Sequence, residues 1–366
     1  MLFRSQVGHR HAVTQRLPQV QARQIMQVTD QLRRQRPVQT QLRHQLGAIG
    51  AAGALASRVI DRLYPEYSIV AVDFRRKAQL PQDIPSYQVQ MQHRFLEDVF
   101  RRHSIDAVIH IGRIFAHESD RYRRYNANVL GTKRLLDLSL KYGVSEVLIH
   151  STFLVYGASP YNPALLDEDY PLMASEVTQE LVDSVELESL ANIYLWKYPQ
   201  LNMTILRPAT VLGPDVRNTM SLLLSRSVAP VLVGFSPMMQ FLHVEDMADA
   251  LVLAFRHSKP GIYNVAPDDW VAYQDAVVQC GCRRLPIPSV PPAIPAMIST
   301  ALNWNAIFPR YLINYLKYPV VVDGRLFRET FGWKPRYMLN DIFNYYRKRK
   351  LIRSGAVRMP PRRDLA

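Results

Sequence analysis

Short apolar runs alternate with amphipathic stretches from about residue 46 to residue 266, and this alternation restricts the fold more than any other feature of the sequence. Near-continuous apolar runs fit strands that are buried on both faces of a sheet, and the stretches between them have the length and period of helices. Strands that alternate with helices predict βαβ units around a doubly wound parallel sheet, an α/β fold. The expected strands are 68–73, 87–91, 106–111, 146–151, 202–207 and 261–266, and the expected helices are 54–64, 94–102, 122–142, 176–196, 218–227 and 245–257.

The sequence divides into a body and two flanking segments. Residues 1–45 contain eleven glutamines and no apolar period, so we expect a disordered extension or mistranslated upstream sequence. Residues 46–345 carry the alternating pattern, which thins after residue 260 into proline-rich connections and predicts a smaller C-terminal part. Residues 346–366 form a basic tail.

The charge of the chain is concentrated at its two ends. The net charge at pH 7 is +14, of which residues 1–45 and 347–366 contribute +7 each, so the 301 residues between them sum to zero. A basic body would indicate nucleic acid as the main partner. Basic ends predict only a weak, salt-sensitive contact with nucleic acid or anionic membrane.

Cysteine usage and the N-terminal sequence predict a cytoplasmic protein. Cys280 and Cys282 cannot form a disulfide framework, and one C-x-C lacks the second pair of ligands that a zinc site needs. The N-terminus lacks the apolar core of a signal peptide. The longest uncharged run, 25 residues between Arg284 and Arg310, contains six prolines and predicts a loop with a short apolar helix, with membrane-surface contact as the alternative.

A glycine-rich stretch, LGAIGAAGALASRVIDRL, is expected to join the first strand to the first helix. Glycines let the backbone turn sharply and approach a pyrophosphate, and Asp73, about twenty residues on, would accept hydrogen bonds from a ribose hydroxyl. Gly47, Gly50 and Gly53 form a complete triplet, whereas Gly50, Gly53 and Ala56 give the more usual distance to Asp73 and are favoured. The preceding TQLRHQ is a poor match to a buried strand.

Two arginines directly after Asp73 leave the choice between NAD and NADP open. Arg75 and Arg76 could hold the 2′-phosphate of NADP. Alternatively they are solvated charges on a loop, which is the interpretation that we favour.

Motifs along residues 46–345 resemble the extended short-chain dehydrogenase/reductase family, the NAD-dependent epimerases and dehydratases of sugar nucleotides. In the family's order they are GAAGALA, VAVD, DAVIHI, NANVLGTKRLLDLSLKYGVSEVLIHSTFLVYG, ILRPATVLGP, FLHVEDMADALVLA and GIYNVA. The resemblance implies a seven-stranded Rossmann sheet, a bound NAD or NADP, and a substrate-binding part built mainly from residues 158–180, 213–240 and 267–320. It also implies a homodimer through the helices near 122–142 and 176–196.

The resemblance also implies roles for single residues. Thr152, four residues before Tyr156, falls on the family's catalytic Ser/Thr, which bonds the substrate oxygen. Asn128 matches a structural and active-site asparagine, and Arg207 with Pro208 match the strand end beside the nicotinamide.

The Tyr-x-x-x-Lys pair that moves the proton in this family is absent. Its tyrosine works because the lysine and the oxidised nicotinamide stabilise the phenolate. Aligning the helix QELVDSVELESLANIYLWKYP places Val182 and Glu186 at these positions, and a shift by one residue places Asp183 and Leu187 there. Glu186 or Asp183 therefore remains as a substitute proton acceptor.

Other tyrosine and lysine pairs fail on position. Tyr194 and Lys197 are three residues apart at the end of the helix. Tyr346 and Lys350 have the right spacing but lie in the basic tail, where we expect a solvated face.

A further departure follows the strand 106–111. The family usually reads H-L-A-A there, whereas this chain reads HIGR and places Arg113 near the pyrophosphate and the nicotinamide ribose. Arg113 could strengthen phosphate binding or fill the pocket, and the sequence leaves both open.

Two functions follow from these features. The first is hydride transfer at a carbinol carbon of a nucleotide sugar or similar hydroxylated substrate. The second is a non-catalytic nucleotide-binding sensor or scaffold with the same fold, which the loss of the tyrosine and lysine favours.

Overall fold

The computed structural model describes residues 44–353 except 75, 90–92, 115–120 and 290–308. Almost all of the predicted extension 1–45, Arg75, most of the proline-rich run and the tail beyond Arg353 therefore lie outside the described residues.

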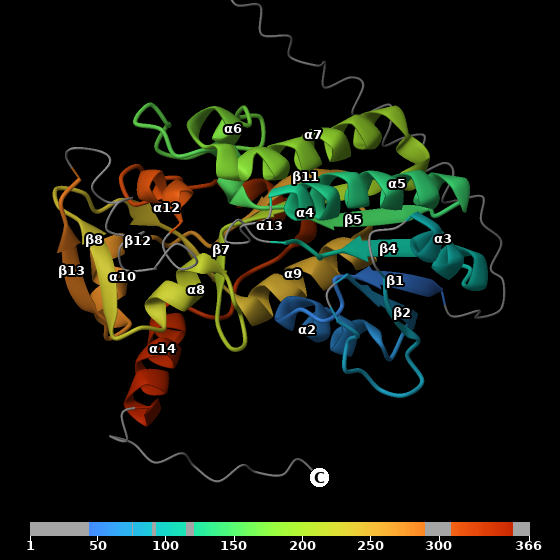
Figure 1. The fold of residues 1–366 in the computed structure, drawn as a ribbon, viewed down its shortest axis with the longest axis horizontal. Coiled ribbons are helices and arrows are strands. Elements are labelled where there is room, and N and C mark those ends of the chain that lie inside the picture. Colours follow the sequence, from blue (N-terminus) through green and yellow to red (C-terminus); the bar gives the residue numbers. More distant parts are fainter. Residues whose placement is uncertain (1–43, 75, 90–92, 115–120, 290–308, 354–366) are drawn as a thin grey trace, which may run out of the picture. The chain divides into compact units, whose positions relative to one another are not determined.

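Seven parallel strands form the central sheet in the order β11-β6-β5-β4-β1-β2-β3 (Figure 1). From β1 the chain builds outward through β2 and β3, then returns to the other side of β1 for β4, β5, β6 and β11. The strand order therefore reverses between β1 and β4, which is where doubly wound folds bind ligands. This confirms the predicted Rossmann-type α/β fold. The strands are β1 Gln45–Ile49, β2 Ser68–Asp73, β3 Ser86–Gln88, β4 Ala107–His110, β5 Glu146–His150, β6 Met203–Pro208 and β11 Gly261–Val265.

Helices cover both faces of this sheet. On one face, α2 Ala54–Leu63, α9 Val244–His257 and α13 Arg325–Phe331 pack in one apolar cluster with the strands. On the other face, α3 His93–Arg102, α5 Gly131–Lys141 and α7 Val182–Lys197 do the same. Figure 1 shows the layers, with α5 and α7 above the sheet and α2 and α9 below it.

Each expected strand and helix has a counterpart, but the first strand lies later than expected. It is Gln45–Ile49, inside the stretch predicted as a loop, and Leu46, Ala48 and Ile49 are buried. Of TQLRHQ, the structure describes only His44 and Gln45, and Gln45 is the first residue of the strand. The buried residues of the first strand therefore come from LGAI, so the poor match of TQLRHQ to a buried strand does not count against it.

Two expected helices are each divided. The helix expected over 122–142 consists of α4 Arg121–Tyr125, a π-helical turn Asn126–Leu130 and α5. The helix expected over 176–196 consists of α6 Ala174–Val177, a 3₁₀ turn Gln179–Leu181 and α7. π-helical turns inside α-helices often occur at functional sites.

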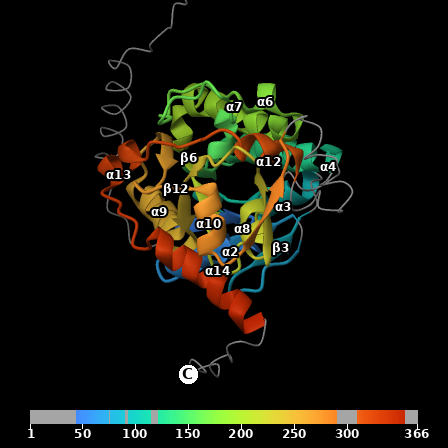
Figure 2. The ribbon, with the colours of Figure 1, turned by 90° about the vertical axis from the view of Figure 1, so that its left-hand side faces the viewer.

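A further apolar cluster joins most of the elements after β6 to the segments around Tyr156 and Leu181. Figure 2 shows α10 and α14 of this cluster, which pack against each other. The remaining elements are β7 Thr210–Leu212, α8 Thr219–Leu224, β8 Val228–Leu232, β9 Met238–Met239, β10 Phe241–His243, β12 Val271–Ala272, α10 Tyr273–Gln279, β13 Arg283–Ile287, α12 Arg310–Tyr315 and α14 Leu339–Arg353, with a 3₁₀ turn at Phe153–Tyr156. A further 3₁₀ turn, Pro199–Leu201, packs with α7 on the central sheet.

The predicted boundary at residues 345/346 falls inside α14, in which Tyr346 is 1% exposed. The described part of the chain contains no helix with the length and apolar character needed to span a membrane.

Candidate active site

The turn between β1 and α2 brings its backbone against the end of β4. Gly50 has a φ of +89°, a conformation that glycine adopts without strain. A Cβ at Gly50 would lie 2.3 Å from the Cα of Gly112, so this close approach requires glycine. The Gly50 amide donates to the Val72 carbonyl at 2.7 Å, which fixes the turn against β2. The Gly50 turn and Gly112 therefore form a backbone cradle where the strand order reverses.

The register Gly50, Gly53 and Ala56 is the one that occupies this turn. Gly53 is the N-cap of α2 and supplies no side-chain hydrogen bond, so the first amides of the helix can face an anion. Gly47 lies inside β1, and a Cβ there would meet Ile105 at 3.3 Å. The triplet that begins at Gly47 is therefore wrong as a phosphate turn, because Gly47 packs within the sheet.

Asp73 ends β2 beside this turn and is 2% exposed. Its carboxylate accepts hydrogen bonds from the amides of Ala52 at 3.1 Å and Arg76 at 3.4 Å. The Arg76 guanidinium donates to the Ala52 carbonyl at 3.0 Å. The acid predicted to hold a ribose is thus anchored to the glycine turn.

An open pocket adjoins the cradle. It unites residues from the ends of β1, β2 and β4 and from the π-helical turn. Its lining residues are Gly50, Asp73, Phe74, Gly112, Arg113, Ile114, Ala127 and Asn128. The structure therefore brings together four of the residues that the sequence nominated for a cofactor: Gly50, Asp73, Arg113 and Asn128.

Asn128 connects the strand β4 side of the pocket to α7. Its side-chain oxygen accepts from the Ile114 amide at 2.9 Å, and its side-chain nitrogen donates to the Ile114 carbonyl at 2.8 Å. The same nitrogen donates to Oδ2 of Asp183 at 2.6 Å. The π-helical turn thus directs Asn128 inward, between the segment after β4 and the helix that carries the substitute acids.

The two candidate proton acceptors lie on different faces of α7. Asp183 is 5% exposed, and its Oδ1 accepts from Nε of Arg124 at 3.3 Å. Glu186 is exposed and raises the pKa of Tyr125 through a side-chain hydrogen bond. Of the two, only Asp183 is buried against the Asn128 side of the pocket.

Thr152 lies at the tip of β5, where the strand passes into a 3₁₀ turn. Its hydroxyl oxygen caps that turn by accepting from the Leu154 amide at 3.3 Å. Thr152 is half-buried. The hydroxyl hydrogen remains able to donate to a ligand oxygen.

A buried ion pair behind Thr152 was missed from the sequence. Glu188 of α7 is 0% exposed and pairs with Arg207 of β6, which is 2% exposed. The Ser151 hydroxyl donates to Glu188, and Arg207 donates to the Tyr156 hydroxyl at 2.8 Å. Arg207 thus links α7 to the segment after β5 at the ends of the strands.

Pro208 ends β6, where it is buried and pairs with Val265 of β11. The signal for Glu188 was present in the sequence. It lies on the buried stripe of α7 formed by Ser184, Leu187, Glu188, Ala191 and Leu195.

The described tyrosine and lysine side chains make no relay with Thr152. Lys197, the lysine of α7, lies in its last turn over the Tyr198 ring, and Tyr194 donates to Asp137. On α14, the Tyr346 hydroxyl accepts from the Gly213 amide at 3.4 Å, and Lys350 donates to the Cys280 carbonyl at 2.6 Å. The expected solvated face for the latter pair is wrong, because Tyr346 is in the core.

Two histidines and Arg113 stand at the strand tips beside α7. Burial, together with the Arg113 charge, lowers the pKa of His110 to about 4 and that of His150 to about 3. Nδ1 of His110 and both ring nitrogens of His150 lack a hydrogen-bond partner among the described residues. Burial also lowers the pKa of Arg113, whereas the carboxylates of Asp183 and Glu188 oppose this shift.

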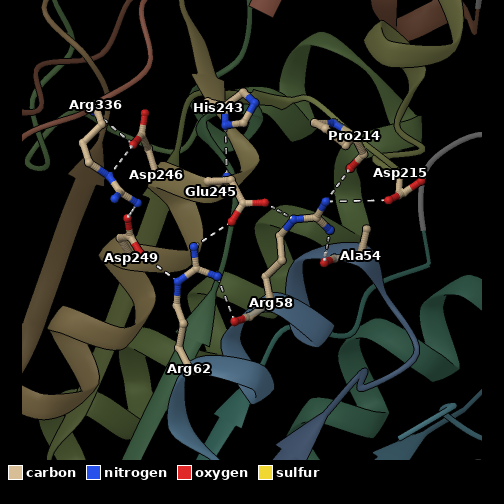
Figure 3. Close-up of polar contacts among 10 residues, drawn as sticks. All are labelled: Ala54, Arg58, Arg62, Pro214, Asp215, His243, Glu245, Asp246, Asp249 and Arg336. Atoms are coloured by element: carbon tan, nitrogen blue, oxygen red, sulfur yellow. Dashed lines mark hydrogen bonds and ion pairs between the residues drawn. The ribbon is translucent and has the colours of Figure 1, made fainter. Parts of the chain in front are cut away.

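An ionic cluster holds the helix of the glycine turn in place (Figure 3). On α2, Arg58 donates to Glu245 at 2.5 Å, and Arg62 donates to Glu245 at 2.6 Å and to Asp249 at 2.8 Å. His243 caps α9 by accepting from the Glu245 amide at 3.3 Å. The cluster therefore ties α2 to α9 below the sheet.

Comparison with known proteins gives a family match over most of the body. The family model described as "NAD dependent epimerase/dehydratase family" matches residues 48–266. An uncharacterized protein of Mycobacterium tuberculosis is 28% identical over 269 residues, which are 72% of this chain and 71% of the relative. A UDP-glucose 4-epimerase of Azospirillum brasilense is 28% identical over 247 residues, 58% of this chain and 68% of the relative.

Solved structures share the architecture. The UDP-glucose 4-epimerase of Thermus thermophilus in complex with NAD superposes with a TM-score of 0.66 at 18% identity, over 83% of this chain and 99% of that chain. The dTDP-glucose 4,6-dehydratase of Bacillus anthracis in complex with NAD superposes with a TM-score of 0.64 at 19% identity, over 83% of this chain and 97% of that chain. At this identity the likeness shows the fold.

Proposed function

The chain belongs to the NAD-dependent epimerase/dehydratase family, and on this premise we propose that it binds NAD at the Gly50 cradle and transfers hydride at a carbinol carbon of a nucleotide sugar or similar hydroxylated substrate. The observation that carries the proposal is the contact between Gly50 and Gly112, which keeps side chains out of the cradle. Bound NAD would supply the hydride acceptor.

The residues of the cradle fit a dinucleotide. The uncapped N-terminus of α2 suits a diphosphate, because helix amides without partners stabilise negative charge. Asp73 at the end of β2 suits an unphosphorylated ribose, since a carboxylate would repel a 2′-phosphate. Arg76 donates to the turn. NAD is therefore favoured over NADP.

On the substrate side, Thr152 and Asp183 are the proposed reacting groups. Thr152 can donate its hydroxyl hydrogen to the substrate oxygen, because its own oxygen is held by the Leu154 amide. Asp183 is the proposed proton acceptor, and Arg124 and Asn128 fix its carboxylate. Both carboxylate oxygens are thus already engaged by protein donors, so slow turnover is expected.

The test is a titration with NADH and NADPH, followed by incubation of the NAD complex with UDP-glucose and dTDP-glucose. Binding is read from nucleotide fluorescence, and hydride transfer from absorbance at the reduced-nicotinamide band. We expect NADH to bind more tightly than NADPH. Asp183→Asn should lower turnover more than Glu186→Gln does. Failure to bind either dinucleotide would refute the proposal.

A second candidate is a non-catalytic NAD-binding sensor or scaffold. Its support is that α7, the helix on which the family has its tyrosine and lysine, contributes buried Asp183 and Glu188, each already paired with an arginine. Tight dinucleotide binding with no transfer to either nucleotide sugar would favour this function over the first.

A homodimer is proposed through α4 and α7. Their exposed faces carry large apolar side chains, with Tyr122 84%, Ile193 57% and Trp196 57% exposed. Sedimentation should give a dimer for the full chain and a monomer for the double variant Ile193→Glu, Trp196→Glu. A monomeric wild-type protein contradicts this proposal.

The basic ends are proposed to add weak binding to nucleic acid or anionic membrane. The trimmed chain for this test should end at Arg353, because cutting at residue 346 would remove the last part of α14. If the trimmed chain 43–353 still binds nucleic acid or anionic vesicles in a salt-sensitive way, the basic ends are not the binding segments. The cytoplasmic location stays a prediction from the sequence.

A further inference from the structure

The helix α7 brings negative charge, and no lysine, to the reaction end of the site. Its buried ionisable residues in the first half are Asp183 and Glu188, and Lys197 is in its last turn. In the family that the chain resembles, this helix supplies an ammonium group. A cation for this end of the site must therefore come from another element.

Arg113 is the residue in position to supply it. It follows β4 by three residues and lines the pocket with Gly50, Gly112 and Asn128. The parallel register pairs His110 with Ile149, so residues 113 and 152 continue from the tips of neighbouring strands. The Arg113 charge also acts on His150 of β5 and on both buried acids of α7. From the tip of β4, the Arg113 charge thus acts on groups of both β5 and α7.

Among the described residues, Arg113 has no counter-ion of its own. Asp183 is paired with Arg124, and Glu188 is paired with Arg207. Within the part of the chain that the structure describes, the Arg113 side chain makes neither a hydrogen bond nor an ion pair, although it is half-buried. An unpaired, partly desolvated cation costs free energy unless a ligand compensates it.

We propose that Arg113 is the fixed positive charge at the reaction end of the cofactor cleft, supplied from the tip of β4 in place of a lysine in the first half of α7, which has none. This inference rests on the proposed function. The charge is expected to favour the neutral nicotinamide of NADH over the cationic ring of NAD⁺, because like charges repel across a low-dielectric cleft. The opposing possibility, that Arg113 fills the cleft and hinders the dinucleotide, predicts tighter binding when the side chain is removed.

The experiment measures dissociation constants of NADH and NAD⁺ by calorimetry for the full chain and for Arg113→Met, which keeps bulk and removes charge. Arg113→Lys keeps the charge, and Arg102→Met removes an exposed arginine at the far end of α3. For Arg113→Met we expect NADH affinity to fall about tenfold. The ratio of the NAD⁺ to the NADH dissociation constant should fall at least about fivefold. Arg113→Lys should keep most of that ratio, and Arg102→Met all of it.

The melting temperature without nucleotide separates ligand binding from a structural role. Arg113→Met should leave it unchanged or raise it, because the charge that is removed has no partner. An unchanged ratio, tighter NADH binding, or a lower melting temperature with unchanged affinities would each overturn the inference. Absence of dinucleotide binding by the wild-type chain would instead refute the proposed function, and this inference with it.

Discussion

Substituting Gly50 by alanine tests the cradle, because the change should destabilise the fold in two separable ways, through the backbone conformation and through a steric clash. The backbone at φ +89° is unfavourable for an L-residue by about 1–2 kcal/mol. The new Cβ would also lie 2.3 Å from the Cα and 2.4 Å from the amide nitrogen of Gly112. These are backbone atoms held by the β4 segment, so the turn must move and further destabilisation of about 1–3 kcal/mol is expected. The total is about 2–5 kcal/mol.

Gly234→Ala is the matched control. Gly234 has a φ of +85°, and a Cβ there would meet nothing within 4 Å. It should therefore show the backbone cost alone. The melting temperature of Gly50→Ala should lie several degrees below that of Gly234→Ala, and only Gly50→Ala should lose NADH binding. Equal melting temperatures, or NADH binding by Gly50→Ala at wild-type affinity, would refute the reasoning.

Three further perturbations test the supports of the site. Glu188→Gln leaves Arg207 buried without its counter-ion and should cost about 3–5 kcal/mol in denaturant unfolding, whereas a double change to methionine at both positions should recover part of the loss. Arg58 and Arg62 lower the pKa of Glu245 although its partial burial opposes this shift. The contribution of Glu245 to the free energy of unfolding is therefore present above pH 4.5, its ordinary pKa, and is lost as the pH falls below that value. Glu245→Gln should therefore cost about 1 kcal/mol at pH 7, less in high salt and less in acid, as followed by melting temperature. The pKa of His150 is lowered to about 3, so its unfolded form binds the proton first below 6.5 and stability falls between 6.5 and 3. His150→Asn should flatten that part of the pH profile of stability, and an unchanged profile would contradict the assignment.

The sheet could be predicted because buried parallel strands are nearly all apolar. SIVAVD and EVLIH therefore stand out from the amphipathic helices around them. The first strand was misplaced because the glycine in QLGAI is typical of a turn. In the structure Gly47 lies within the strand, where the lack of a side chain lets it pack closely against Ile105. A glycine that serves packing and one that serves a positive φ look alike until the neighbouring strand is known.

The positions of candidate residues could be predicted where the local backbone sets them, and their roles stay predictions. Gly50, Asp73 and Thr152 lie at strand ends, which the sequence locates directly. Arg207 was assigned beside the nicotinamide, but its partner Glu188 lies on another element and no local pattern pairs them. For the same reason the choice between Asp183 and Glu186 needed the helix faces that the fold reveals.

A crystal structure of the chain grown with NADH tests the central claim most directly. We predict density for the dinucleotide in the pocket between Gly50, Asp73 and Gly112, with its diphosphate at the N-terminus of α2 and its reduced ring toward Arg113 and Thr152. An empty pocket at saturating NADH, or a nucleotide bound elsewhere, would contradict it.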